Sequence, residues 1–271
     1  MSRRQVNKKR PSLGSIIFLV FVIIAFIAAI GVGAWMYFHT AEYDKETACR
    51  KAHGGLQAKE QVVFLFDVTD KLNEDVADRL RLYVSKTINK LPSETLIEFY
   101  VLDDRISNYK ADYLHCIPLK PEEAGVTDNA EMVKKEFNKK FKKQLTAAID
   151  RLSSSTKTYD RSPICEMIKA VVLQSFGNNK VKVMGSRRLI VISDFMHHLP
   201  GHYSMYRDGI DFEKFKKSAY GSGLLLDSVG LESENIEAEL WYTKSMTPAN
   251  ANFWKKYFEK AGITVERAGR I

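Results

Sequence analysis

The chain has 271 residues, and the part beyond its N-terminal segment is long enough for one sizeable domain or two small ones. Its formal charge of +8 comes from 41 basic and 33 acidic residues, but five of the basic residues (Arg3, Arg4, Lys8, Lys9 and Arg10) lie in the first ten positions. The rest of the chain has 36 basic and 33 acidic residues, a charge balance that is ordinary for the surface of a soluble domain. Net charge therefore gives no reason to expect a nucleic-acid-binding protein.

Residues 13–38 contain no charged side chain and predict a transmembrane helix. An α-helix rises ~1.5 Å per residue, so roughly 20 apolar residues cross a bilayer core of ~30 Å. The alternative is a cleaved secretory signal, whose apolar region usually has only ~7–15 residues and ends in small side chains. This run is longer and ends in Trp-Met-Tyr-Phe, which favours an uncleaved single-pass anchor.

The basic tail, residues 1–12, predicts the orientation of that anchor. Lys and Arg are retained on the cytoplasmic side of a membrane, and the segment after the anchor mixes acidic and basic residues. We therefore expect a cytoplasmic N-terminus and a periplasmic or otherwise extracytoplasmic C-terminal region. Residues 39–60 resemble a lead-in or stalk with a turn at Gly54-Gly55, and residues 61–271 are expected to form the domain.

The three cysteines, Cys49, Cys116 and Cys165, are widely spaced and have neither a disulfide-framework pattern nor zinc-ligand spacing. In an oxidising compartment one bridge could form, with Cys49–Cys116 as the preferred pair. Free thiols are an equal alternative, because the sequence gives no geometry.

Buried apolar runs that alternate with amphipathic segments predict an α/β fold. The expected strands are 61–66, 96–102, 189–192, 236–242 and 263–265, with an edge strand near 113–117. Helices are expected after Asn73, over 131–152, from Pro163 with Ser162 as its N-cap, over 212–217 and from Pro248. This alternation predicts a Rossmann-like, mostly parallel central sheet with helices on both faces.

The predicted helix 131–152 carries six lysines on one face: Lys134, Lys135, Lys139, Lys140, Lys142 and Lys143. Such a run can attract anionic lipid head groups or nucleic acid. Aromatic side chains do not interleave with it on the exposed side, so a solvated helix face is the simpler interpretation.

Carboxylates and hydroxyls collect where the predicted strands end. Asp67 and Thr69 follow the first buried strand, Ser162 lies at a helix start, and Asp194 follows another buried strand. Ligands of open parallel sheets bind outside the carboxyl ends of the strands. Two carboxylates with two hydroxyls suit Mg²⁺, although aspartates after strands also cap loops and helices.

Five features follow one another along the chain: a buried strand with Asp-x-Thr, an amphipathic helix, a strand, Ser-Pro at a helix start, and a strand with Ser-Asp. This order resembles that of the von Willebrand factor type A (vWA) domain. The resemblance covers about 61–271 in organisation, and its sequence match is confined to these short motifs. In that family a metal-ion-dependent adhesion site uses Asp-x-Ser-x-Ser, a Thr and an Asp from three loops, and an acidic group of the partner can complete the coordination. The resemblance implies Mg²⁺ ligands at Asp67, Thr69, Ser162 and Asp194.

Two residues depart from the family's pattern. Lys71 occupies the final Ser position, and Asp70 adds a carboxylate beside it. An ammonium group cannot ligate Mg²⁺ and would form ion pairs with Asp67 or Asp194. The expected site is therefore a weakened metal site, one rearranged around Asp70, or an ion-pair cluster without metal.

Three histidines, His197, His198 and His202, follow Asp194 in one loop. A proline and a glycine lie between His198 and His202 and disfavour a regular helix there. No Glu lies between these two histidines, so the metalloprotease motif is absent. We expect solvated histidines that, with Asp70, Tyr203 and the nearby Tyr206, contact a partner.

The resemblance favours a protein-binding component of a membrane or envelope-spanning assembly, without enzymatic activity. A hydrolase is the alternative from another class, with Asp67 as nucleophile and Asp70 as acid–base partner. Position 69 is Thr rather than a second carboxylate, and the sequence has no nucleophile elbow or phosphate-binding glycine loop. A third alternative is a structural scaffold subunit with a degenerate site.

Overall fold

A computed structural model describes residues 13–39, 42–102, 110–123, 130–153, 159–177, 180–226 and 235–271. The chain divides into two compact units, residues 1–42 and 43–271. The basic tail 1–12, on which the predicted orientation rests, lies outside the described residues.

The first unit contains one long apolar helix, α1 (Leu13–His39). Its central window Ile17–Ala34 has a mean hydropathy of 3.0, and none of it is buried. By length and composition this helix can cross a membrane, which confirms the predicted candidate span. An N-terminal signal sequence would satisfy the same criterion.

The second unit is an α/β domain with a mixed sheet. Its strands are β1 (Arg50–Ala52), β2 (Gly55–Ala58), β3 (Glu60–Asp67), β4 (Thr95–Leu102), β5 (Tyr113–Cys116), β6 (Val181–Val183), β7 (Arg187–Ser193), β8 (Ile236–Tyr242) and β9 (Thr264–Arg270). Its helices are α2 (Glu74–Lys90), α3 (Ala130–Glu136), α4 (Lys143–Ser153), α5 (Ile164–Val172), α6 (Met205–Asp208), α7 (Phe212–Lys217), α8 (Ala219–Ser222) and α9 (Pro248–Glu259), with a 3₁₀ turn η1 (Pro121–Glu123) and π-helical segments η2 (Phe137–Lys142) and η3 (Leu173–Gly177).

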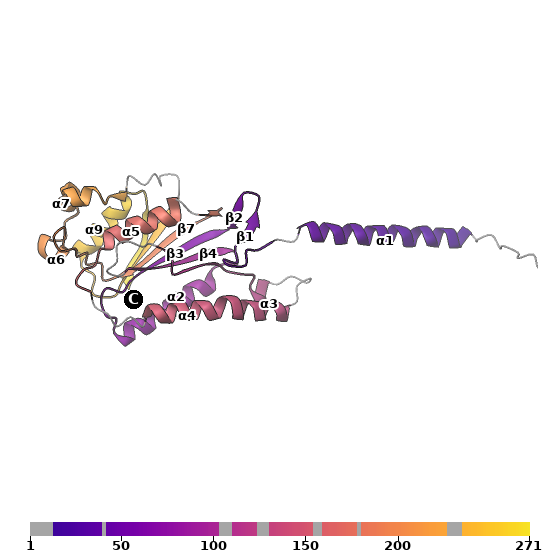
Figure 1. Ribbon diagram of the computed structural model, residues 1–271, viewed down its shortest axis with the longest axis horizontal. Coiled ribbons are helices and arrows are strands. Elements are labelled where there is room, and N and C mark those ends of the chain that lie inside the picture. Colours follow the sequence, from indigo (N-terminus) through magenta and orange to yellow (C-terminus); the bar gives the residue numbers. More distant parts are fainter. Residues whose placement is uncertain are drawn as a thin grey trace, which may run out of the picture. The chain divides into compact units, whose positions relative to one another are not determined.

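The main sheet has the strand order β5-β4-β3-β7-β8-β9. β3 pairs in parallel with β4 and β7, and the β7–β8 and β8–β9 pairs are also parallel. β5 pairs antiparallel with β4, which confirms the predicted edge strand and makes the sheet mixed. Helices α5, α7 and α9 lie on one face of this sheet, and α2 and α4 lie on the other (Figure 1).

Alternate residues of β3 enter two different hydrophobic cores. Val63 and Leu65 pack with α5, α7 and α9, whereas Val62, Phe64 and Phe66 pack with α2 and α4. Successive side chains of a strand point to opposite faces, so a strand covered on both sides is apolar throughout. The continuous apolar run that predicted this strand therefore reflects burial on both faces.

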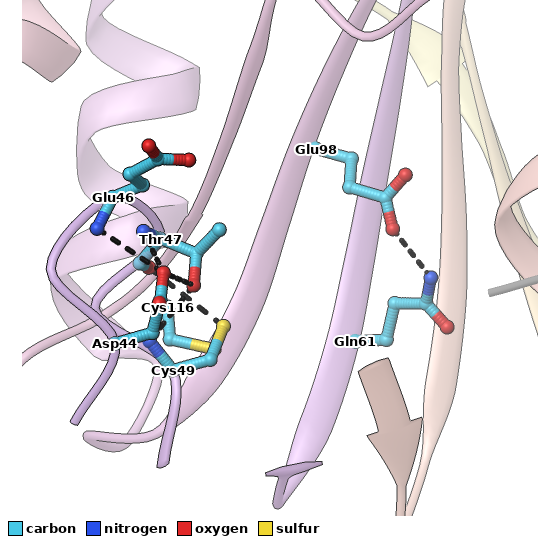
Figure 2. The surroundings of a disulfide bond; sticks show 7 residues. All are labelled: Asp44, Glu46, Thr47, Cys49, Gln61, Glu98 and Cys116. Carbon is cyan, nitrogen blue, oxygen red and sulfur yellow. Dashed lines mark hydrogen bonds between the residues drawn. A yellow bond between two sulfur atoms is a disulfide. The ribbon is translucent and has the colours of Figure 1, made fainter. Parts of the chain in front are cut away.

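The segment predicted as a stalk belongs to the second unit from Tyr43 onward. β1 and β2 form a hairpin through Gly54-Gly55, and β2 pairs in parallel with β6, which the sequence did not predict. Cys49 and Cys116 form a disulfide that joins this segment to β5 (Figure 2). Cys165 is free and buried.

Beside that disulfide, the main sheet contains a polar cluster that the sequence analysis did not identify (Figure 2). Glu98 of β4 is buried and accepts hydrogen bonds from Gln61 Nε2 (2.6 Å), Tyr100 OH (2.9 Å) and Ser175 Oγ (2.9 Å). Three donors satisfy the oxygens of this buried carboxyl group, which has no ion-pair partner among the described residues, as a buried polar group requires.

The predicted lysine-bearing helix is present as α3, η2 and α4 in succession. Phe141, Leu145 and Ile149 are buried on the side of this helix that faces the sheet, as the apolar spacing predicted. The change to π-helical hydrogen bonding over η2 was not foreseen, because a single wide turn leaves the apolar period almost unchanged.

Candidate functional site

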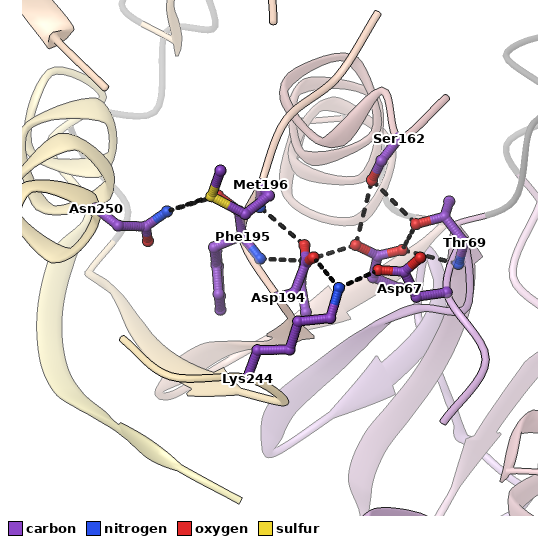
Figure 3. Close-up of polar contacts among 10 residues, drawn as sticks. Asp67, Thr69, Ser162, Asp194, Phe195, Met196, Lys244 and Asn250 are labelled. Carbon is purple, nitrogen blue, oxygen red and sulfur yellow. Dashed lines mark hydrogen bonds and ion pairs between the residues drawn. The ribbon is translucent and has the colours of Figure 1, made fainter. Parts of the chain in front are cut away.

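Three loops meet at the carboxyl ends of β3, β7 and β8. Asp67 is the last residue of β3, Ser193 is the last residue of β7, and Lys244 follows β8 by two positions. Parallel strands end at the same edge of a sheet, so their loops bring these side chains together (Figure 3).

Asp67 is buried at the centre of this cluster. Its Oδ1 accepts hydrogen bonds from the backbone N–H (3.0 Å) and hydroxyl (2.6 Å) of Thr69. Its Oδ2 accepts from Ser193 Oγ (2.6 Å) and from Ser162 Oγ (3.4 Å), and the Thr69 and Ser162 hydroxyl oxygens lie 3.1 Å apart. Three of the four predicted ligand residues therefore meet, and Ser193 joins them.

Asp194 faces a lysine on the other side of the cluster. Its Oδ1 accepts from the backbone N–H of Met196 (2.8 Å), and its Oδ2 lies 2.9 Å from Lys244 Nζ. The same ammonium lies 2.5 Å from Asp70 Oδ2. Asp70, Lys244 and Asp194 thus form one ion-paired group. Figure 3 shows Lys244 and Asp194 beside the Asp67 network.

The two parts of the cluster have different electrostatics. Burial, together with the nearby charge of Asp194, raises the pKa of Asp67 to about 6, although its bonds to Ser193 and Thr69 act in the opposite direction. Partial burial lowers the pKa of Lys244, but its bonds to Asp70 and Asp194 outweigh this and hold the pKa above the usual lysine range. The lysine is therefore fully charged at neutral pH.

The Mg²⁺ ligand set implied by the resemblance does not fit this arrangement. Mg²⁺ requires near-octahedral oxygen ligands, whereas both Asp67 oxygens already accept from hydroxyl or N–H donors and Asp194 is paired with an ammonium. Within the described residues, His, Cys, Asp and Glu side chains form no group of three arranged for a metal ion. The side chains fit an ion-pair cluster.

The lysine expected to pair with these carboxylates was Lys71, and that expectation was wrong. Lys71 is exposed and makes no ion pair in the described part of the chain. Lys244 supplies the ammonium instead.

Ser162 does not cap a helix as predicted. α5 begins at Ile164 after Pro163 and has no side-chain cap. The Ser162 backbone instead pairs with His198 in both directions, through N–H···O distances of 2.7 and 2.9 Å. This pairing turns the Ser162 hydroxyl toward Asp67 and fixes the histidine loop to the start of α5.

The histidine loop is only partly solvated, which corrects the expectation for two of its residues. His197 is fully buried, and its Nδ1 accepts from the Cys165 N–H (3.4 Å) while its Nε2 lies 3.2 Å from Tyr220 OH. Burial, with a smaller contribution from His198, lowers the pKa of His197 to about 3. Tyr203 is also buried and donates to the Gly209 carbonyl (2.7 Å).

The remaining residues predicted to contact a partner reach the surface. His202 is exposed and stacks on Tyr220 with 5.2 Å between ring centroids, and Tyr206 is 63 % exposed. His198 is half-buried, and its Nδ1 lies 2.8 Å from Ser204 Oγ. The Asp70 side chain is 44 % exposed.

The loop after β7 is fixed from behind by α9. Phe195 has a positive φ of 57°, which is uncommon for a bulky residue and turns the chain sharply after Asp194. Its carbonyl accepts from Asn250 Nδ2 and Trp254 Nε1, each at 2.9 Å. The position of Asp194 is therefore set by the packing of a helix and not by the loop alone.

Sequence reasoning missed Ser193 and Lys244. Both follow from the rule that identified Asp67 and Asp194, because Ser193 directly follows the predicted strand 189–192 and Lys244 follows the predicted strand 236–242 by two positions. The order of the strands, which makes β7 and β8 neighbours, was the missing information.

No protein-family model and no curated protein matches this sequence.

Proposed function

We propose that the chain is a single-pass, membrane-anchored protein-binding module of a membrane or envelope-spanning assembly. Its α/β unit, with a Rossmann-like, vWA-like organisation, binds the partner through the loops at the carboxyl ends of β3, β7 and β8. The proposal is supported by the convergence of Asp67, Thr69, Ser162 and Asp194 at this end of the sheet.

The observation that carries the proposal is the ammonium of Lys244 between Asp70 and Asp194. The Lys244 side chain is 56 % exposed, so a fixed positive charge faces solvent beside the 44 % exposed Asp70 carboxylate, whereas the Asp194 carboxylate is only 7 % exposed. In the vWA family the positive charge comes from a metal that an acidic group of the partner contacts. Here we expect an acidic group of the partner to approach Lys244 directly, without Mg²⁺.

The hydrolase alternative gains no support from this geometry. A nucleophilic carboxylate must reach its substrate, but Asp67 is buried and both its oxygens accept hydrogen bonds. A scaffold with a purely structural cluster remains the competing explanation, because an ion-paired lysine also stabilises loops.

Two features support a location beyond the membrane for the α/β unit. α1 has the length and apolarity of an anchor, and the Cys49–Cys116 disulfide suits an oxidising compartment. Reducing compartments rarely contain structural disulfides, so both features agree with the orientation predicted from the basic tail.

Co-purification of partners with the full chain from solubilised membranes tests the proposal. We expect Lys244→Ala to lose its partners and the matched variant Lys71→Ala to keep them, since Lys244, unlike Lys71, is ion-paired with the site carboxylates in the part of the chain that the structure describes. Chelation of divalent cations should leave the partners bound. Equal thermal melting of the two variants controls for folding.

The other results have distinct meanings. Loss of partners only on chelation would support a metal-dependent adhesion site, and unchanged partners in every sample would support a scaffold. Phosphatase turnover that is abolished in Asp67→Ala would support the hydrolase instead.

A further inference from the structure

The helix formed by α3, η2 and α4 presents a strip of positive charge to solvent. The strip consists of Lys134, Lys135, Lys139, Lys142 and Lys143, whose side chains are all exposed. None of the five makes an ion pair within the described residues. Over residues 130–153 the sequence has seven basic and three acidic side chains, and one of the acidic three, Asp150, lies 3.6 Å from Arg81. We call these five residues the lysine strip.

The opposite side of the same helix is packed into the core of the unit. Phe141, Leu145 and Ile149 are buried in the core that also contains β3 and α2. The helix cannot rotate to hide the lysine strip, so the strip is a fixed surface of the unit. Met132, near its N-terminal end, is an apolar side chain that is 63 % exposed.

The N-terminal end of this helix lies beside the point where the unit begins. A groove of about 800 Å³ is lined by Tyr43, Asp44 and Glu46 on one side and by Met132, Val133 and Phe137 among others on the other side. Residues 43–46, at the start of this unit, and the first turns of the lysine-bearing helix are therefore neighbours in space.

The covalent chain limits how far this groove can be from the end of α1. α1 ends at His39, and Tyr43 follows four residues later. Consecutive Cα atoms are 3.8 Å apart, so this tether is at most about 15 Å long. If α1 spans a bilayer, its C-terminal end lies near the head groups, and the chain holds Tyr43, one of the residues that line the groove, within that distance of His39.

We propose that the lysine strip docks the α/β unit onto anionic phospholipid head groups of the bilayer that contains α1. This inference rests on the membrane anchor of the proposed function and adds a second, electrostatic contact with the same membrane. Exposed lysines near an anionic surface are attracted over about one Debye length, ~10 Å at 0.1 M salt. The short tether keeps the strip at a high effective concentration near that surface.

Lipid is a better occupant of this surface than nucleic acid. The exposed side of the helix has no aromatic side chain between the lysines on which a base could stack. Every copy of the chain that is anchored by α1 has a bilayer close to the α/β unit, whereas the anchor brings no nucleic acid close to it. A helix face that is merely solvated is the outcome that would overturn the proposal.

The test uses the full chain in nanodiscs made either of phosphatidylcholine alone or of phosphatidylcholine with phosphatidylglycerol. Lysine acylation by an amine-reactive ester is followed at each residue by mass spectrometry. A surface potential of about −30 to −50 mV raises the local proton concentration about three- to sevenfold, so the strip amines should react more slowly by at least this factor in the anionic discs. Lys216 and Lys217 on α7, which packs on the opposite face of the sheet, should react equally in both discs.

A charge-reversal variant identifies the strip as the cause. Lys135→Glu/Lys139→Glu/Lys142→Glu should abolish the lipid-dependent protection of Lys134 and Lys143, and high salt should do the same in the wild-type chain. The matched control Lys216→Glu/Lys217→Glu/Lys256→Glu should leave that protection intact.

Two negative results are distinguishable. If the chain stays in both kinds of disc but the strip reacts at the same rate in each, the docking proposal is overturned and the anchor stands. If the chain is retained in neither, both the anchor and the docking are overturned.

Discussion

Lys244 Nζ lies 2.9 Å from Asp194 Oδ2, at the edge of the sheet where β7 and β8 end side by side. The two residues are fifty positions apart in the sequence and meet only because these strands are parallel neighbours. The chain itself, through Lys244, therefore supplies the positive charge that balances the carboxylates of Asp70 and Asp194.

Removal of that ammonium should create affinity for a divalent cation. Lys244→Ala leaves Asp70 and Asp194 without their shared cation, and their mutual repulsion can then be relieved by Mn²⁺ or Mg²⁺. Mn²⁺ binding measured by electron paramagnetic resonance should be negligible in the wild-type chain and in Lys71→Ala, and measurable in Lys244→Ala. Equal Mn²⁺ binding by all three proteins would show that Lys244 does not block the site.

Asp67 should make folding more favourable as the pH falls. Its pKa is raised from 3.8 to about 6 in the folded protein, so the folded state binds more protons between these values and stability declines as pH rises through this window. Asp67→Asn removes this titration. The free energy of unfolding of Asp67→Asn relative to wild type should therefore increase by about 2 kcal/mol between pH 4 and pH 7, at 1.36 kcal/mol per pKa unit.

Denaturant unfolding of the detergent-solubilised full chain at several pH values measures this difference. The comparison with the variant is needed because His197, whose pKa is lowered to about 3, acts in the opposite direction and costs stability as pH falls below about 6.5. A difference between the two proteins that does not change with pH would contradict the raised pKa of Asp67.

His197 and His202 should differ sharply in their contribution to stability. His197→Ala leaves a cavity and removes the acceptor for the Cys165 N–H, so it should cost about 2–4 kcal/mol. His202→Ala removes only an exposed ring stacked on Tyr220 and should cost less than about 1 kcal/mol. Denaturation midpoints at pH 7.5 provide the measurement, and equal costs would contradict the burial of His197 and the exposure of His202.

The Cys49–Cys116 bridge should contribute measurably to stability. It closes a loop with a sequence separation of 67, for which the chain-entropy relation gives about 4 kcal/mol, within a usual range of about 2–5 kcal/mol. A reductant should lower the unfolding free energy of the wild-type chain and of the control Cys165→Ala by this order, since Cys165 is free. An unchanged unfolding curve in reductant would indicate that the bridge does not form.

Much of the architecture could be predicted from the sequence, because burial on both faces leaves a strong signal. The strands β3 and β7 appear as continuous apolar runs, β4 is an apolar run interrupted by Glu98, and β8 alternates apolar residues with two glutamates. The Asn73 cap of α2 is present, with Asn73 Oδ1 accepting from the Val76 N–H. The hairpin β1–β2 was missed because its strands are short and half-exposed. It is held by β6 and by the disulfide, two long-range contacts that no local pattern reveals.

The candidate site was predicted in part for the same reason. Asp67 and Asp194 lie at strand ends, so their proximity follows from a parallel sheet. Which lysine would reach them depended on the order of the strands, and which histidine would be buried depended on the packing of Tyr220 and α5. Local sequence carries neither kind of information, and Lys71 and His197 were interpreted wrongly as a result.

The central claim is that the end of the sheet carrying Lys244 binds a partner protein. Site-specific photocrosslinking in intact membranes tests it most directly, with the photoreactive residue at Tyr206 beside the site or at Glu237, an exposed position at the opposite end of β8. The account predicts a discrete crosslinked protein from position 206, none from position 237, and loss of the crosslink when Lys244→Ala is added. Crosslinks from position 237 alone, or an equal crosslink from position 206 with and without Lys244→Ala, would contradict it.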